Sequence, residues 1–518
     1  MSEFESVNEL ETYLGNPFNP ESRINFKSIL QDDIASKFPG GPIATLNLWG
    51  LHKYFIPQSS SGRFCSVEES VLLLKSVSSR DLTTAVAYFK TMLATLPVWI
   101  SGSEKQKQEA SRCVASENLF SLALTEEGVG SDFNNITSSA IKSEDKLNLH
   151  LSASKWLINN AQRASFFTTL VKEKSENQAL SLLLLNASEL EKTGFVRTEK
   201  IKTLGVRGAD ISGFEVRDAL ISSDCVLGKS GTGLQTLSKT FQVSRIICTG
   251  LSLGAVNSAL KIVSKFSLER SIYGAKVKDL QLVQYTLARA YLDYNIIEEC
   301  SRFFARSLHS HPEMACMWSS VAKYLIPTMS EDIISNLSRI LGARHFLEQD
   351  NTFGMFQKIM RDNLLVSLFD GSTQVNLSHI AAQLPMALNS DRKAVSPSAA
   401  EPSEVDFESL RYRLSRSDPV MGAHLNQIPA IESLLKNAVA PPNSIEIFDA
   451  ARSYCLSLSL AICIESSHAL KKSMVKRMKE ILTGQTCLSS KETKPCMDQL
   501  LSKTKTNEDY YGRDSIIE

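Results

Sequence analysis

The chain lacks the features that mark secreted, metal-binding and nucleic-acid-binding proteins. Its ten cysteines form no CxxC pair, and no cysteine–histidine cluster has the spacing of zinc ligands. Basic and acidic residues number 56 each, whereas neutralising nucleic-acid phosphates needs a basic surplus. The first twenty residues carry acids and no apolar run, unlike a secretory signal. We therefore expect a cytoplasmic protein with reduced thiols that binds neither nucleic acid nor a metal.

Long apolar runs are missing too. The longest, Tyr454–Ile464, is interrupted by Ser457 and Ser459 and falls far short of the ~20 residues that span a membrane, so we expect no membrane span. What is present is ordinary globular composition, with 43% hydrophobic and 22% charged residues, which excludes a disordered chain. The length of 518 residues predicts about three to four domain-sized units.

Changes in hydrophobic period place the boundaries of these units. Up to about residue 120 the apolar residues recur at helical spacing, which predicts a helical domain. After Leu122 the period shortens, and Leu147, Leu149 and Leu151 alternate with polar residues. Short strands separated by polar breaks predict an all-β unit, a sandwich or small barrel. Its further strands are expected at Phe166–Val171, Leu182–Leu185 and Phe214–Ile221.

Helical spacing returns near Gly233. Long apolar-faced segments with short connections predict a four-helix bundle. Its helices are expected at residues 234–268, 277–309, 313–342 and 361–385.

A final helical unit is expected beyond a stretch rich in proline, serine and alanine. Asn443 is the expected N-cap, with Glu446 three residues on, of a helix that could run to Gly484. The polar residues 492–518 are expected to fray. Residues 471–482 alternate basic and apolar side chains; we favour a solvated helix face packed on the body over a helix lying on an anionic membrane surface.

The predicted fold is therefore mainly α-helical with a central β domain. The expected units are an N-terminal helical domain (1–121), a central β domain (122–232), a C-terminal four-helix bundle (233–388), a linker (389–405) and a helical extension (406–518).

The first candidate site motif starts the β domain, where residues 125–132 read TEEGVGSD. The glycines let the backbone approach a ligand, and Thr125 and Ser131 add hydroxyl groups, so the loop can bind an anion or a heteroaromatic edge. On its own the motif is more simply a glycine-rich turn before a strand. A second motif, KWLINN at residues 155–160, places Trp156 beside amides that could wall a planar cofactor, although a tryptophan packed in a sandwich core is the simpler interpretation.

Two further motifs lie in the bundle. Residues 370–374 read DGSTQ, where Asp370 is either a base or the N-cap of the helix that begins near Ser372. Residues 270–274 read RSIYG, where Arg270 either clamps a pyrophosphate or pairs with a neighbouring carboxylate, Glu269 or Asp279.

Taken together, the motifs resemble those of the acyl-CoA dehydrogenase superfamily of flavoproteins over about residues 20–385. The family segments T-E-P-x-A/G-G-S-D, K-x-W-I-T/S-N, G-x-R-G-S, R-x-x-F-G…Q and R-D…E-G-T correspond to residues 125–132, 155–160, 205–209, 270–281 and 361–372. Five motifs in order, at family-like intervals, make this resemblance specific, and the fold expected from hydrophobic period agrees with it.

The resemblance implies that FAD binds between the β domain and the C-terminal bundle. Leu157 takes the place usually held by a tryptophan against the flavin ring, and Asn159 that of a Thr or Ser near flavin N5. Arg270 and Gln281 would reach the FAD of a neighbouring subunit, which implies a homodimer or homotetramer. The implied cofactor-binding residues are Thr125, Ser131, Leu157, Asn159, Arg270, Gln281, Gly342, Ser372 and Gln374, and the implied substrate-binding residues are Ser131, Arg245 and Gly371.

The implied catalytic base is Asp370, where the family usually has glutamate. Some members carry the base just before the arginine of the first long helix, but here Ser244 precedes Arg245 and offers no carboxylate. Asp is one methylene shorter than Glu, and a misplacement of about 1 Å can cost ~100-fold in rate. Either the backbone lies closer, or the substrate is not a simple fatty acyl thioester.

The implied function is FAD-dependent α,β-dehydrogenation of an acyl thioester carried on CoA or on an acyl carrier protein. Electron-transfer flavoprotein is one candidate acceptor. An oxidase of the same fold is the first alternative, including one like the nitroalkane-oxidising branch, which resembles this chain in its aspartate base. A non-catalytic binding or assembly module is the second, motivated by the departures at Leu157, Asn159 and Asp370.

Overall fold

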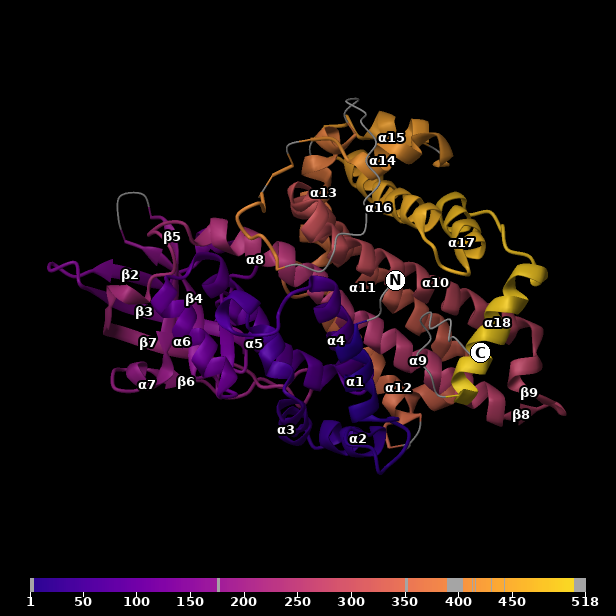
Figure 1. Ribbon diagram of the computed structural model, residues 1–518, viewed down its shortest axis with the longest axis horizontal. Helices are drawn as coiled ribbons and strands as arrows, with labels where there is room; N and C mark the ends of the chain where they lie inside the picture. Colours follow the sequence, from indigo (N-terminus) through magenta and orange to yellow (C-terminus); the bar gives the residue numbers. More distant parts are fainter. Residues whose placement is uncertain are drawn as a thin grey trace.

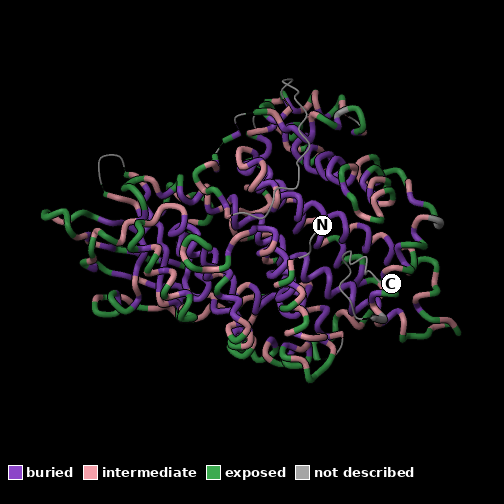
Figure 2. Tube along the Cα trace, viewed as in Figure 1, coloured by how far each residue is buried: buried purple, intermediate pink, exposed green. Residues whose placement is uncertain are grey.

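The computed structural model describes residues 4–506 apart from 175–177, 350–352, 389–403, 412, 415, 430 and 442 (Figure 1). Its N-terminal unit is helical, as predicted, with α4 and α5 buried along most of their length (Figure 2). α5 begins after Asp81, whose carboxylate accepts the backbone N–H groups of Thr83 and Thr84 at 3.2 and 2.8 Å. The helices are α1 (Glu5–Leu14), α2 (Phe26–Ile34), α3 (Gly40–Trp49), α4 (Val67–Ser78), α5 (Leu82–Ser101) and α6 (Glu104–Ala115).

The β domain is one curled sheet of seven strands in the order β1-β4-β2-β3-β7-β6, with β5 paired to β4. β1 and β2 run parallel to β4, and the remaining pairs are antiparallel. The predicted strands lie within β3, β4, β5 and β7. The elements are β1 (Phe120–Ala123), β2 (Ser139–Lys142), β3 (Asn148–Asn159), β4 (Phe166–Glu173), β5 (Leu180–Asn186), α7 (Ala187–Leu190), β6 (Val196–Arg197) and β7 (Ile211–Ser222).

The C-terminal bundle follows, so the predicted fold class is confirmed. One prediction is wrong: residues 361–385 are not a single helix. α12 ends at Asn363, and positive φ angles at Asp370 (52°) and Gly371 (95°) turn the chain before α13 begins. The elements are α8 (Gly233–Ile247), α9 (Thr249–Glu269), the hairpin β8 (Ser271–Ile272) and β9 (Ala275–Lys276), α10 (Gln281–Ser310), α11 (Ala315–Leu341), α12 (Gly354–Asn363) and α13 (Thr373–Ala387).

The extension is helical and differs from the prediction in two places. Asn443 is not the N-cap, because its φ of 67° is left-handed; the Ser444 hydroxyl accepts the N–H of Ile447 at 3.3 Å instead, and the helix ends at Glu465. Residues 490–506 form a helix that packs against α10 rather than fraying, and the rest of the segment expected to fray, residues 507–518, lies outside the described residues. The predicted linker lies, up to residue 403, outside the described residues. The helices are α14 (Pro419–His424), α15 (Ile431–Asn437), α16 (Ile445–Glu465), α17 (Lys471–Thr483) and α18 (Ser490–Thr506).

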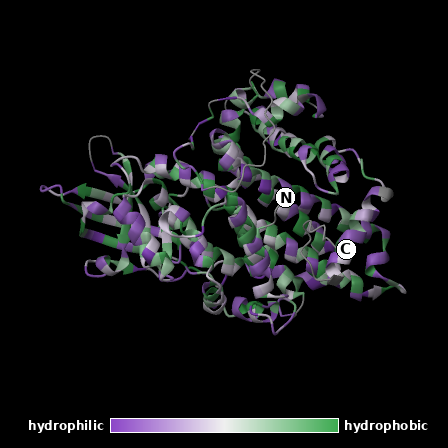
Figure 3. Ribbon diagram, in the orientation of Figure 1, coloured by the Kyte–Doolittle hydropathy of each residue, from purple (hydrophilic) through white to green (hydrophobic). Residues whose placement is uncertain are grey.

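Two helical stretches of the described chain are long and apolar enough to cross a membrane, Gly233–Glu269 and Ile445–Glu465 (Figure 3). Their most apolar windows are 100% and 67% buried inside the protein, as expected of core helices. α17 also packs on the body: Arg477 donates to both carboxylate oxygens of Asp293 on α10, at 2.7 and 2.9 Å.

A buried carboxylate ties the extension to the bundle. Asp418 accepts the indole N–H of Trp318 on α11 at 2.8 Å and the hydroxyl of Tyr454 on α16 through one oxygen. Its other oxygen accepts the backbone N–H groups of Val420 and Met421 at 2.9 and 3.0 Å. Burial raises the pKa of Asp418, and these hydrogen bonds act in the opposite direction. The carboxylate is thus the acceptor on which two buried side chains from different units depend.

We expect Asp418→Ala to lower the free energy of unfolding by roughly 3 kcal/mol, because two buried donors lose their acceptor at about 1–3 kcal/mol each. Urea denaturation measures the change. Asp449→Ala on α16 is the control, since its ion pair with Arg452 is half exposed and contributes about 0–1 kcal/mol. Equal midpoints for the two variants would contradict the anchoring role.

Candidate active site

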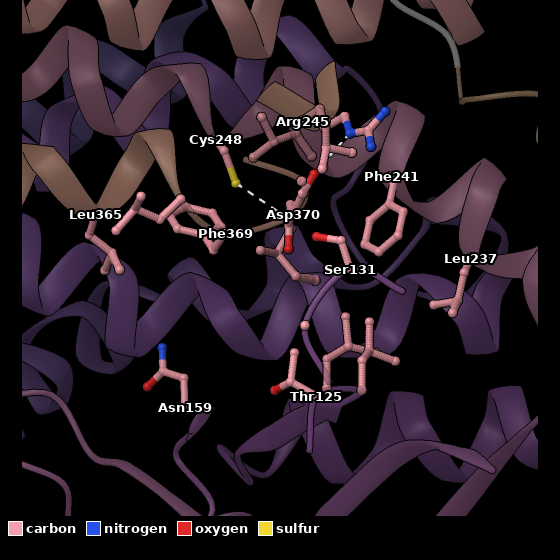
Figure 4. A pocket seen from close by; sticks show the side chains of 18 of the residues that line it. Thr125, Ser131, Asn159, Leu237, Phe241, Arg245, Cys248, Leu365, Phe369 and Asp370 are labelled. Atoms are coloured by element: carbon pink, nitrogen blue, oxygen red, sulfur yellow. Dashed lines mark hydrogen bonds between the residues drawn. The ribbon is translucent and has the colours of Figure 1, made fainter. Parts of the chain in front are cut away.

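A cavity of about 1570 Å³ lies where the N-terminal helices, the β domain and the C-terminal bundle meet (Figure 4). Its walls come from α5, α8, α13, the ends of β1 and β3, and the segment that precedes α13. A pocket for one small ligand has roughly 300–1,000 Å³, so this cavity has room for a cofactor and a substrate together.

Asp370 lies in this cavity on the turn before α13. Its positive φ costs a non-glycine residue about 1 kcal/mol or more, a strain that clusters at functional sites. Arg245 of α8 holds the turn, donating from Nε to the Asp370 carbonyl at 2.9 Å and from Nη1 to Ser320 at 3.1 Å. A Cβ at Gly371 would lie 2.9 Å from the same guanidinium. Burial lowers the pKa of Arg245 to about 10, so Arg245 stays charged at neutral pH.

One carboxylate oxygen of Asp370 is held and the other is not. The Ser244 hydroxyl donates to Oδ2 at 2.9 Å, and the Cys248 sulfur lies 3.9 Å from the same oxygen. Burial, with the charge of Asp370 adding to it, raises the pKa of Cys248, so this group is a neutral thiol. Oδ1 makes no hydrogen bond with any residue in the described part of the chain, and the carboxylate points toward the centre of the cavity (Figure 4). The alternative that Asp370 caps α13 is wrong, because Ser372 is the N-cap.

The segment before Asp370 is held by Lys323 of α11. The buried ammonium donates to the carbonyl of Val366 and lies 4.3 Å from the centroid of the Phe369 ring. Burial lowers the pKa of Lys323 to about 8, with Cys248 and Asp370 opposing that shift. Cations of two helices therefore fix the backbone before the turn, at Val366, and in the turn itself, at Asp370.

The β domain contributes the wall that faces this turn. Thr125 and Ser131 line the cavity, and the Thr125 hydroxyl donates to the Trp156 carbonyl at 2.6 Å. A register shift between Trp156 and Ile158 leaves Leu157 as an extra residue with a φ of 56°, and this β-bulge places Leu157 on the cavity wall. Trp156 does not line the cavity. With 38% of its surface exposed it is not a core residue either, so both interpretations of the tryptophan are wrong.

A buried ion pair fixes the loop that carries Thr125 and Ser131. Lys155 donates to Glu126 at 2.9 Å, and Glu126 also accepts the backbone N–H groups of Thr137 and Ser138 at 2.6 and 3.0 Å. Burial alone would raise the pKa of Glu126, but the hydrogen bonds from Ser138 and Thr137 and the charge of Lys155 hold it at about 2. Burial lowers the pKa of Lys155 to about 8 against the attraction of Glu126. These two motif residues are therefore structural.

We expect Glu126→Gln to cost roughly 3 kcal/mol of stability at pH 7, because it leaves a buried cation without its partner. The difference between parent and variant should be full above about pH 4.5, the ordinary pKa of Glu, and shrink as the pH falls toward 2, since the unfolded chain takes up the proton first. Urea denaturation between pH 2 and 7 measures it. The exposed neighbour Glu127→Gln is the control, and a pH-independent difference would contradict the assignment.

The Arg361-Asp362 motif joins three units of the structure, and Arg361 also lines the cavity. Lys358 of α12 donates to Asp81 at 2.6 Å, to Thr83 at 2.9 Å and to Asp362 at 2.5 Å. Asp362 in turn accepts the backbone N–H of Val206, from the β domain, at 2.6 Å. Burial would lower the pKa of Lys358, but the surrounding aspartates raise it well above its usual range.

Arg361 completes this junction. It donates to Asp33 of α2 at 2.6 Å and to the carbonyl of Leu204 at 2.8 Å. A Cβ on Gly205 would lie 2.4 Å from the Arg361 carbonyl oxygen, so these two backbone segments approach so closely that only glycine fits at position 205. The motifs at residues 205–209 and 361–362, far apart in the sequence, are thus in contact.

Of the predicted site residues, those that line the cavity are Thr125, Ser131, Leu157, Asn159, Arg245, Asp370 and Gly371. Three other candidates do not line the cavity and serve the local fold or are exposed. Gly342 ends α11 with a φ of 58°, Ser372 caps α13, and Gln374 is exposed on α13. Their predicted roles in FAD binding stay predictions.

Arg270 and Gln281 lie at the far end of the bundle, beside the β8–β9 hairpin (Figure 1). Both are exposed and neither lines the cavity of its own chain. The structural alternative for Arg270 is wrong, because Glu269 pairs with Lys265 and Asp279 with Lys278. Their expected contact with a neighbouring subunit's FAD stays a prediction.

Three residues at the cavity had little signal in the sequence. In the sequence, Ser244 was notable only because it has no carboxylate at a position where some family members carry the base. In the structure it is the hydrogen-bond partner of Asp370. Gln242 and Arg413 line the same cavity, the second from the extension. No group of three or more His, Cys, Asp or Glu side chains in the described ranges could hold a metal ion.

The cavity fits a bound flavin in one further respect. Asn159 donates from Nδ2 to the Val86 carbonyl at 3.1 Å, while its Oδ1 is buried without a partner among the described residues. An unsatisfied buried acceptor costs about 1–3 kcal/mol, which a donor on a bound group would recover. Thr125, Ser131, Leu157 and Asn159 are therefore the residues that would hold such a group.

Comparison with known proteins gives consistent matches. Family models match residues 121–219 (acyl-CoA dehydrogenase, middle domain) and residues 231–384 (acyl-CoA dehydrogenase, C-terminal domain). A probable medium-chain specific acyl-CoA dehydrogenase of Caenorhabditis briggsae is 24% identical over 359 residues, covering 68% of this chain and 84% of the relative.

Two solved structures share the fold at low identity. A prolyl acyl carrier protein oxidase, AnaB, has a TM-score of 0.65 at 17% identity and covers 73% of this chain and 97% of its own. An acyl-CoA dehydrogenase complexed with FAD from Bacillus anthracis has a TM-score of 0.74 at 14% identity and covers 98% of this chain and 95% of its own. The fold of this last structure therefore includes a counterpart of the extension.

Proposed function

The chain belongs to the acyl-CoA dehydrogenase superfamily of flavoproteins, and we propose that it oxidises an acyl thioester between Cα and Cβ with Asp370 as the base. Members of the superfamily are FAD-dependent oxidoreductases that act on CH–CH groups, so the predicted enzyme class and cofactor are confirmed at the level of the family. The observation that carries the proposal is the Asp370 carboxylate, held through one oxygen and free at the other.

Asp370 is placed to take a proton from the α-carbon. A thioester α-proton is weakly acidic, and a positioned carboxylate contributes about 10²–10⁴-fold to its removal. Ser244 orients the carboxylate through Oδ2, which leaves Oδ1 for the proton. The strained backbone at Asp370 and its bond to Arg245 bring the shorter side chain to the cavity.

The turn also offers a donor for the oxygen of the thioester. The backbone N–H of Asp370 makes no hydrogen bond with another described residue. A backbone N–H at this position can stabilise the negative charge that develops on the carbonyl oxygen as the α-proton leaves. Bound FAD would accept the hydride from the β-carbon.

The two sides of the cavity differ in polarity in a way that suits a thioester. Around α4, α5, the start of α9 and the segment before Asp370 the lining is apolar except for Lys90 and Arg361. It includes Leu74, Phe89, Leu93, Leu251, Leu365 and Leu368. Between α8 and α13 the lining carries polar side chains, among them Gln235, Ser238, Gln242 and Gln383. We assign the first side to the acyl group and the second to its carrier.

Asp370→Asn should reduce substrate-dependent flavin reduction by roughly 100- to 10,000-fold while flavin still binds, because the amide keeps the shape and loses the basicity. Anaerobic bleaching of the flavin band with acyl-CoA and acyl-carrier-protein thioesters is the measurement. Oxygen consumption with the same thioesters distinguishes an oxidase from a dehydrogenase. Bleaching of the Asn variant at the parent rate would remove Asp370 from the reaction.

Asp370→Glu tests the fit of the shorter base. If the turn has moved in to suit Asp, the longer side chain overreaches and activity falls. If activity toward ordinary acyl-CoA rises, the backbone is instead that of the glutamate enzymes, and the proposal of a closer turn is wrong.

Ser244→Ala should lower kcat by roughly 10- to 100-fold with little change in KM, because a hydrogen bond to a charged group is worth about 1.5–3 kcal/mol and Ser244 does not line the cavity. Ser244→Thr keeps the hydroxyl and should retain most of the activity. A rise in KM at constant kcat, or failure of the Thr variant to exceed the Ala variant, would show that Ser244 does not position the base.

A further inference from the structure

The described residues of the segment 404–418, which are all but 412 and 415 and are here called the strap, lead from the described start of the extension to the Asp418 anchor. The strap runs beside α8 (Figure 1) and is attached there and to α13 through its backbone. Lys239 donates to the Phe407 carbonyl at 2.8 Å and Gln242 to the Arg411 carbonyl at 2.7 Å. The backbone N–H of Leu414 donates to Gln383 at 3.0 Å. The extension is thus attached to two helices that form the catalytic cavity.

These attachments make the strap part of the cavity wall. Arg413 and Leu414 line the cavity together with Gln242 and Gln383. Gln242 lies three residues before Arg245, about 4.5 Å along the axis of α8, and Arg245 holds the Asp370 turn. The strap therefore lies about one helical turn from the base, on the polar side of the cavity.

Two polar groups on this wall have no partner among the described residues. Only 2% of Gln242 is exposed. Its Nε2 donates to the Arg411 carbonyl of the strap, while its Oε1 is buried and has no hydrogen-bond partner among the described residues. Arg413 is exposed and forms no ion pair with a described carboxylate, unlike Arg416, which pairs with Glu313 at 3.1 Å. A buried acceptor and an outer cation suit a ligand that carries an N–H group along its length and an anion at its end.

We propose that the strap completes the carrier side of the site and binds a phosphopantetheine arm, with Gln242 accepting an amide N–H and Arg413 contacting the phosphate. The inference rests on the proposed function, because only a thioester on such an arm would bring these groups past Asp370. The phosphate is common to CoA and to an acyl carrier protein, so the wall by itself recognises the chemistry that both share. Arg413 and Leu414 then determine specificity from outside the two family-matched domains.

The test compares thioesters of one acyl group on CoA, on an acyl carrier protein and on N-acetylcysteamine, which keeps one amide but has no phosphate. Arg413→Ala should raise KM about tenfold for whichever phosphorylated carrier the parent uses, with kcat retained, and leave the N-acetylcysteamine thioester unchanged. Added salt should weaken parent binding toward that of the variant, because the contact is exposed. Arg416→Ala, on the same strap but off the cavity, should change none of these values.

An equal effect of Arg413→Ala on all three thioesters, or no effect on any, would overturn the proposal. Calorimetry that compares the binding of 4′-phosphopantetheine with that of pantetheine tests the strap site separately from the proposed function, since the binding measurement needs no turnover. Parent protein that prefers the phosphorylated arm, with the preference lost in Arg413→Ala, supports the strap site even if no thioester is oxidised. Parent protein that binds both arms equally rules the site out even if a thioester is oxidised.

Discussion

The arrangement of the three units depends on one buried cation, Lys358. It joins α12 to Asp81 at the start of α5, and Asp362 beside it accepts a backbone N–H from the β domain. A buried ion pair gains little net stability, but breaking one leaves an uncompensated charge and costs about 3–5 kcal/mol. Separating the units would leave these buried charges unpaired. The network therefore selects this docking, and the docking creates the cavity.

The turn at Asp370 is also fixed by buried cations. Asp370 is held in a left-handed conformation because Arg245 on α8 bonds its carbonyl and Lys323 on α11 bonds the preceding segment. Neither cation forms an ion pair with a described carboxylate. Arg245 donates to the Asp370 carbonyl, and Lys323 donates to the Val366 carbonyl. The strain at Asp370 is thus offset by two helices that are themselves fixed in the bundle, so the Asp370 carboxylate is positioned by rigid elements rather than by a free loop.

The replacement of the usual glutamate by aspartate has a structural counterpart. The position that carries the base in some relatives holds Ser244, and its hydroxyl now contacts the carboxylate. The two positions are therefore in contact through the hydrogen bond from Ser244 to Asp370. The extension also contributes to the cavity. The strap is attached to α8 and α13 through its backbone, and the side chain of Arg413 lies on the cavity wall.

The sequence alone determined the fold class, four strands of the β domain and several of the residues that line the cavity around Asp370, because hydrophobic period and motif order are local properties. It did not reveal that residues 361–385 break at Asp370, that Leu157 is a bulge residue, or that residues 490–506 form a packed helix. In the sequence, three structural residues could not be distinguished from site residues: Glu126, Lys155 and Asp362. Their roles depend on contacts with segments that are distant in the chain. Ser244, Gln242 and Arg413 became functional candidates only in the tertiary structure. Their significance depends on what faces them across the cavity, and packing of distant segments, rather than local sequence, decides that.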